Sequence, residues 1–146
     1  MVNFAVCTVV WFIAVTAAFV LHILKDRVPD VLWASTALVW AFLAAFGLTL
    51  FSVKECLISA FVVFVLWLVL IFVNLNMPGG VMKGLITGAL FMGRYAALNV
   101  FLWSVFLFVT LFFTMIFNVE DEKHDGVAVL VISSFLTFVL MYVFLF

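Results

Sequence analysis

Hydrophobic residues fall into five long runs along the chain, separated by short polar stretches. The runs cover residues 2–24, 31–53, 56–75, 95–119 and 126–146, and none of them contains an Asp, Glu, Lys or Arg. A helix needs about 20 apolar residues to cross roughly 30 Å of hydrocarbon, and every run reaches that length. A surface helix of a soluble protein keeps a polar face, and these runs have none. The pattern predicts an all-α integral membrane protein, a bundle of five transmembrane helices.

Residues 81–93, just before the fourth run, are harder to place. From residue 84 to residue 119 they form with that run a stretch of about 36 residues, which as one helix would be over 50 Å long at 1.5 Å per residue. We favour a short interfacial helix over residues 81–93, because Lys83 and Arg94 bracket it and their side chains can reach the headgroups. The alternatives are one long tilted helix and a re-entrant hairpin. Another arrangement of this long stretch would leave four spans.

The spans and their connections account for essentially the whole chain. Residues 1–146 are therefore expected to form a single polytopic membrane domain with no soluble domain. The first run has no basic segment before it and no cleavage site after it, so we interpret it as a retained span rather than a signal peptide.

The basic residues predict an orientation. In a five-span chain, the first and third connections share one side of the membrane and the second and fourth share the other. The first side carries Lys25, Arg27, Lys83 and Arg94, and the second carries Lys54 and Lys123. Because basic residues are enriched on the cytoplasmic side, the N-terminus is expected outside and the C-terminus inside.

Composition strengthens the membrane assignment and narrows the partners. Hydrophobic residues make up 71% of the chain and the mean hydropathy is +1.52, far outside the range of soluble proteins. The net charge of −1 and six unclustered basic residues argue against nucleic acid as a partner. Membrane lipids and other membrane subunits are the expected partners.

Titratable residues give little sign of catalysis. No run holds an acid or a base of the kind that an embedded active site needs, so we expect no enzyme and no catalytic residues. His22 and His124 fall on opposite sides in the five-span arrangement, so one haem cannot join them, and we expect no cofactor and no metal site. Cys7 and Cys56 are expected to be small buried residues. A disulfide between them is the alternative, because the same arrangement places both near the outer side.

A few residues are candidates for binding or packing. Lys83, Arg94 and Tyr95 are candidate contacts for a lipid phosphate or another anion, although snorkelling to headgroups is the simpler interpretation for the cations. Small residues four apart let helices approach closely in lipid. Such a packing seam is predicted at Ala37, Ala41, Ala45, Gly84 and Gly88.

Tryptophans lie inside the runs rather than only at their ends. Trp11, Trp40, Trp67 and Trp103 occupy mid-span positions, while Trp33 suits the interfacial belt. An indole N–H in the membrane needs a partner, which favours protein contacts over bare lipid.

Two functions remain as hypotheses. The first is a non-catalytic structural or accessory subunit of a larger membrane-protein complex, which contributes helix packing and lipid contacts. The alternative is a small oligomeric channel or transporter subunit. Its pore would be lined by hydroxyl and amide side chains at Thr36, Thr49, Asn99, Ser104, Thr110 and Thr114.

Overall fold

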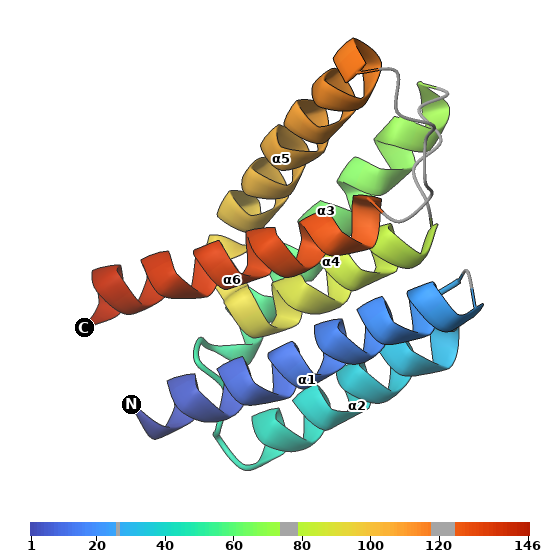
Figure 1. Cartoon of the computed structure of the whole chain (residues 1–146). Helices are drawn as coiled ribbons and strands as arrows, with labels where there is room; N and C mark the ends of the chain where they lie inside the picture. Colours follow the sequence, from blue (N-terminus) through green and yellow to red (C-terminus); the bar gives the residue numbers. More distant parts are fainter. Residues whose placement is uncertain (26, 74–78, 118–124) are drawn as a thin grey trace.

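The computed structural model describes residues 1–25, 27–73, 79–117 and 125–146, and this part of the chain is helical throughout, without strands. The described residues form six α-helices, arranged as in Figure 1, and one short 3-10 helix. In chain order they are α1 (Val2–Lys25), α2 (Asp30–Ala45), α3 (Val53–Phe72), α4 (Gly79–Met92), η1 (Gly93–Tyr95), α5 (Ala96–Phe117) and α6 (Asp125–Leu145).

Among the described residues, four segments are long and apolar enough to cross a membrane: α1, α3, the unit of α4 to α5, and α6. The prediction of an all-helical fold is therefore confirmed, and these segments are consistent with an integral membrane protein. The count of five spans is not. The run over residues 31–53 contains only the 16-residue helix α2, which is about 24 Å long.

Helix α2 ends early because of Gly47. This residue has φ +68°, a left-handed conformation that glycine adopts without strain. Its N–H donates to the carbonyl of Ala44, and the N–H of Leu48 donates to the carbonyl of Leu43 at 2.8 Å. These two bonds form a Schellman motif, which satisfies the last carbonyls of the helix and turns the chain away.

Helix α4 is the most enclosed element of the bundle. It contacts α1, α2, α3, α5 and α6, and nine of its 14 residues are buried. The expected interfacial helix over residues 81–93 is therefore not confirmed, since a helix lying in the interface would leave one face free. Its cations bracket the helix as expected, but the residues between them pack inside the protein.

The long apolar stretch divides at Gly93. Its φ is +49°, and a Cβ atom there would lie 2.5 Å from the ring of Phe51, so the position requires glycine on two grounds. Figure 1 shows the consequence: α4 and α5 meet at this turn and run back in opposite directions.

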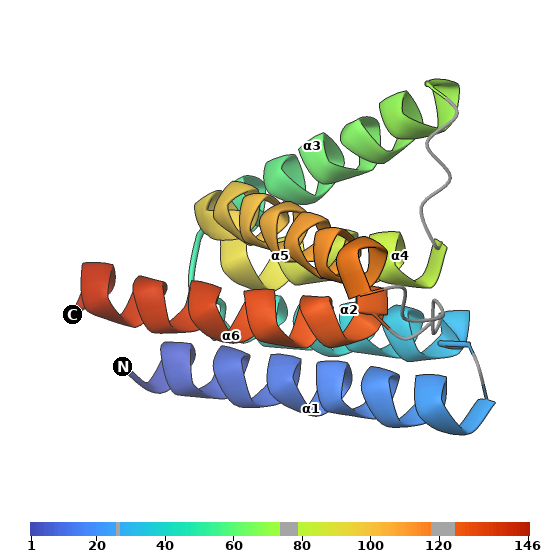
Figure 2. The same cartoon turned by 45° about the horizontal axis from the view of Figure 1, so that its top comes forward.

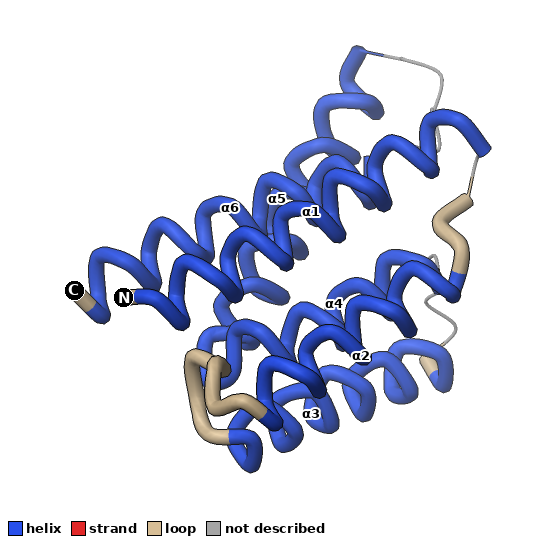
Figure 3. Tube along the Cα trace, turned by 90° about the horizontal axis from the view of Figure 1, so that it is seen from below, coloured by secondary structure: helices blue, strands red, loops and turns tan. Residues whose placement is uncertain are grey.

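Successive helices alternate in direction, and both termini lie at the same end of the bundle in all three views (Figures 1, 2 and 3). The expectation of termini on opposite sides is therefore not supported. It assumed that residues 81–93 do not cross, whereas α4 runs antiparallel to both α3 and α5.

Two tryptophans pack into glycine positions on α4. A Cβ at Gly84 would lie 2.9 Å from the indole of Trp33, and one at Gly88 would lie 2.9 Å from the indole of Trp11. Trp11 also lies 6.1 Å from Trp33 and 5.6 Å from Phe91, ring centre to ring centre. The absent side chains of the glycines are thus what allows α1 and α2 to approach α4.

Helices α3 and α5 diverge from the rest of the bundle toward their far ends in Figure 1, and Figure 2 shows the same for α3. The buried residues of α3 all lie between Cys56 and Val63, and those of α5 between Ala96 and Trp103. The remainder of each helix is half-buried or exposed, with Trp67 and Leu70 of α3 and Phe106 and Leu107 of α5 still packed against the core.

The contact between Gly88 and Trp11 can be tested by adding one methyl group. Gly88→Ala is expected to reduce the free energy of unfolding in detergent by about 1–3 kcal/mol, since the added Cβ overpacks the indole. Gly79→Ala is the matched control, because a Cβ at Gly79 meets nothing within 4 Å. Unfolding would be followed by tryptophan fluorescence, and equal midpoints for the two variants would contradict this packing.

The placement of the termini gives a second prediction. Tags fused to the N- and C-termini should be accessible from the same side of the membrane in intact cells. A cysteine introduced at Val28, in a background without other cysteines, should react only from the other side, because Val28 lies in the connection at the far end of α1. Tags on opposite sides would show an odd number of crossings.

Candidate functional site

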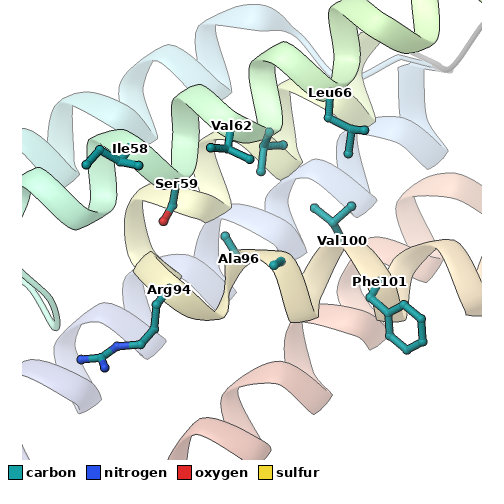
Figure 4. A pocket seen from close by; sticks show the side chains of 10 residues that line it. Ile58, Ser59, Val62, Leu66, Arg94, Ala96, Val100 and Phe101 are labelled. Atoms are coloured by element: carbon teal, nitrogen blue, oxygen red, sulfur yellow. The ribbon is translucent and has the colours of Figure 1, made fainter.

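A groove opens between the diverging helices α3 and α5 and has a volume of about 340 Å³. On one side Ile58, Val62 and Leu66 of α3 follow one another at every fourth residue, so they share a face of that helix. On the other side Val100 and Phe101 of α5 contribute to the lining (Figure 4). The groove is almost wholly apolar along this length.

Arg94 lies at one end of the groove, where α4 turns into α5. Figure 4 shows its guanidinium pointing away from the apolar lining. Its Nε lies 3.4 Å from Oε1 of Glu55, and its Cζ lies 5.2 Å from the centre of the Phe51 ring. Tyr95 packs on the same ring, at 5.8 Å between centres. Arg94 is thus held between a carboxylate and an aromatic face.

Glu55 is positioned by the start of α3. The hydroxyl of Ser52 accepts a hydrogen bond from the backbone N–H of Glu55 at 3.3 Å and donates to its Oε2 at 3.4 Å. This Ser-x-x-Glu pattern is typical of a helix N-terminus. The Arg94 and Glu55 side chains are 63% and 40% exposed, and ion pairs this open contribute only about 0–1 kcal/mol. Arg94 can therefore exchange this partner for another anion at little cost.

Lys83 lies away from this group. Its Nζ is 2.7 Å from Oδ1 of Asp30 at the start of α2. Eleven residues separate Lys83 from Arg94, which places them about 16 Å apart along the axis of α4. Of the three candidate anion contacts, the structure brings Arg94 and Tyr95 together and places Lys83 near the other end of the helix.

The candidate packing residues also divide into two groups. Gly84 and Gly88 are buried in the core against the two tryptophans. Ala37 is half-buried, while Ala41 and Ala45 are exposed. Helix α2 instead packs through its buried residues Trp33, Thr36 and Trp40.

A polar cluster lies between α5 and α6. The hydroxyl of Thr137 donates to Oδ1 of Asn99 at 3.4 Å and to the carbonyl of Ser133 at 2.8 Å. Ser134 is also buried, and its hydroxyl has no hydrogen-bond partner among the described residues. Asn99, a candidate pore residue in the sequence, thus accepts a hydrogen bond from α6. The serines and threonine of α6 were missed, because only their position opposite Asn99 distinguishes them from other membrane hydroxyls.

The remaining pore candidates do not share a lining within the chain. The hydroxyls of Ser104, Thr110 and Thr114 donate to carbonyls of α5 itself, at 2.8, 2.8 and 2.9 Å. Ser104 is exposed, and Thr110 and Thr114 are half-buried. Helix hydroxyls in lipid commonly satisfy themselves in this way.

The indole N–H groups differ in whether they have a hydrogen-bond partner. Trp103 donates to the carbonyl of Gly126 at 3.2 Å, which ties α5 to the start of α6. The buried indole nitrogens of Trp11, Trp33 and Trp40 have no hydrogen-bond partner among the described residues. Trp33, expected in the interfacial belt, is instead buried at 3% exposure.

Both cysteines are buried free thiols, and their sulfur atoms lie near the connection between α2 and α3. The Sγ of Cys7 lies 3.5 Å from the carbonyl oxygen of Leu48, and that of Cys56 lies 3.9 Å from the carbonyl oxygen of Phe51. His22 is buried in α1, whereas His124 lies outside the described residues.

The groove with Arg94 at its mouth is the best-defined candidate site. It combines an apolar groove with a cation at the end where α4 turns into α5, an arrangement suited to binding an amphiphilic ligand. Across residues 1–25, 27–73, 79–117 and 125–146, no three or more His, Cys, Asp or Glu side chains gather to hold a metal ion. No protein-family model matches the chain, and no curated protein or solved structure is significantly similar to it.

Proposed function

We propose that this chain is a non-catalytic structural or accessory subunit of a larger membrane-protein complex. It contributes helix packing and lipid contacts, and its partners are other membrane subunits and membrane lipids. The observation that carries the proposal is the divergence of α3 and α5, in which no residue beyond Val63 and Trp103 is fully buried.

The far portion of α5 has an ordered aromatic surface. Phe108, Phe112, Phe113 and Phe117 form a continuous row of ring contacts, with centres 6.5, 6.4 and 6.1 Å apart. All four rings are more than half exposed. Large rigid aromatic side chains supply much contact area for little lost conformational freedom, so this row suits a partner helix.

The interior supports a non-catalytic role. The described charged side chains lie near the ends of the helices, while the buried hydroxyls of Thr36, Thr87, Ser133 and Thr137 donate to carbonyls of their own helices. The channel alternative has less support, because Ser104, Thr110 and Thr114 follow the same pattern on α5.

We further propose that both termini face the outside of the membrane. Lys25, Arg27 and Lys83 lie at the end of the bundle away from the termini, whereas Lys54 and Arg94 lie near the termini. Because basic residues are enriched on the cytoplasmic side, their excess favours the end away from the termini as the cytoplasmic end. This keeps the N-terminus outside, as expected from the sequence, and moves the C-terminus to the same side.

Extraction in mild detergent followed by native mass analysis tests the subunit proposal. The chain should migrate with at least one other membrane protein. Replacing Phe108 and Phe112 together by Ala should weaken that association at least about fivefold, as expected for aromatic contacts at an interface. Phe42→Ala is the matched control, since Phe42 is 67% exposed on α2 and Phe108 is 71% exposed.

Two results would contradict the proposal. One is a chain that migrates alone under every mild extraction condition. The other is a reproducible unitary current from the purified protein that disappears on replacing Ser104 or Thr110, which would establish the channel alternative.

A further inference from the structure

We infer that the groove between α3 and α5 binds one molecule of an anionic glycerophospholipid. One acyl chain would lie between the two helices and the phosphate would lie at Arg94 and Lys54. This inference does not rest on the subunit proposal, because it concerns a site built by this chain alone.

The length of the groove fits one acyl chain. From Ile58 to Leu66 the α3 side covers about 12 Å of helix axis. A single leaflet offers about 15 Å of hydrocarbon, half of the roughly 30 Å core. The volume of about 340 Å³ falls within the range of small-molecule sites. The groove therefore has room for one chain that enters from the headgroup layer.

The mouth of the groove is positively charged. Lys54 is exposed one helical turn before Ile58, on the row of α3 that lines the groove. Arg94 stands at the same end, and Glu55 is the carboxylate paired with it. Two cations against one carboxylate leave an excess of one positive charge, which is complementary to a phosphodiester.

Arg94 is prepared to bind a phosphate. A guanidinium has five N–H donors in a planar fork, and Glu55 engages it through Nε. The Phe51 ring lies 5.2 Å from Cζ and restricts the tilt of the guanidinium plane. Because the side chain is 63% exposed, its amino groups remain accessible from the headgroup layer.

The position of Ser59 favours a glycerophospholipid over a simpler amphiphile such as a fatty acid. It lines the groove one turn beyond Glu55, about 6 Å deeper along α3. Beyond Ser59 the lining of α3 is Val62, Val63 and Leu66, all apolar. Cations, then a hydroxyl, then hydrocarbon match the order of phosphate, ester carbonyl and acyl chain in a glycerophospholipid. A fatty acid has no ester to meet the hydroxyl.

The test measures lipid retained by the purified full-length chain in native mass spectrometry. Detergent-solubilised protein would be incubated with dioleoyl phosphatidylglycerol, dioleoyl phosphatidylcholine or oleate in separate arms. We expect one retained phosphatidylglycerol per chain, less phosphatidylcholine, and less oleate. Arg94→Gln should reduce phosphatidylglycerol retention about tenfold, in keeping with the loss of a charge-assisted hydrogen bond.

A second variant blocks the groove without changing its charge. Ala97 lines the groove on α5 and is exposed, so Ala97→Phe should fill the channel and abolish retention while the protein still folds. Ala41→Phe, at an exposed alanine of α2, and Arg27→Gln, at an exposed cation of the other end, are the controls. Both should retain phosphatidylglycerol as the unchanged protein does.

Three results would overturn the inference. If the Arg94→Gln and Ala97→Phe variants both retained as much phosphatidylglycerol as the unchanged protein, the lipid would bind elsewhere. Oleate retained as well as phosphatidylglycerol, with no loss in Ser59→Ala, would replace the phospholipid by a fatty acid. A photo-cross-linker at Val62 that captures a protein in native membranes, and no added lipid, would show that a partner helix fills the groove. Co-migration with other subunits would be unaffected by the first two results, so the two proposals fail separately.

Discussion

The packing of two indole rings against glycines of α4 is the contact on which the rest of the fold depends. Lipid tails are as apolar as leucine, so helices in a bilayer associate through close packing rather than through the hydrophobic effect. Gly84 and Gly88 provide this packing, because without side chains they admit the rings of Trp33 and Trp11. The same helix contacts the other five α-helices, so a short segment organises the whole bundle.

The candidate site follows from how α3 and α5 attach to that centre. Both have their fully buried residues only near one end, around the turn at Gly93 and the ring of Phe51. From that point they diverge, and the space between them becomes the groove (Figures 1 and 4). Arg94 follows Gly93 directly, so the residue that allows the turn also places the cation at the mouth. The turn at Gly93 therefore shapes both the fold and the candidate site.

The charges of the bundle are used in two ways. At one end Lys83 forms a close ion pair with Asp30, which ties α4 to α2. At the other end the pair between Arg94 and Glu55 is longer, and the Arg94 side chain is 63% exposed against 38% for Lys83. A short pair suits a structural role, whereas a longer pair with an exposed cation leaves that cation available to an anionic headgroup. This difference is why the lipid site is assigned to Arg94 and not to Lys83.

The sequence alone determined the membrane class, the helical content and several local features. Run length and lack of charge identify membrane helices because these properties belong to each segment by itself. The small residues Gly84 and Gly88 were also recognisable. Only the tertiary structure decided that α4 lies at the centre, that Ala41 and Ala45 face outward, and that the termini share one end. In water an amphipathic pattern shows which face is buried, but an apolar side chain in a bilayer suits lipid and protein equally. The sequence therefore carries no signal for which face packs, and shape complementarity between distant residues makes that choice.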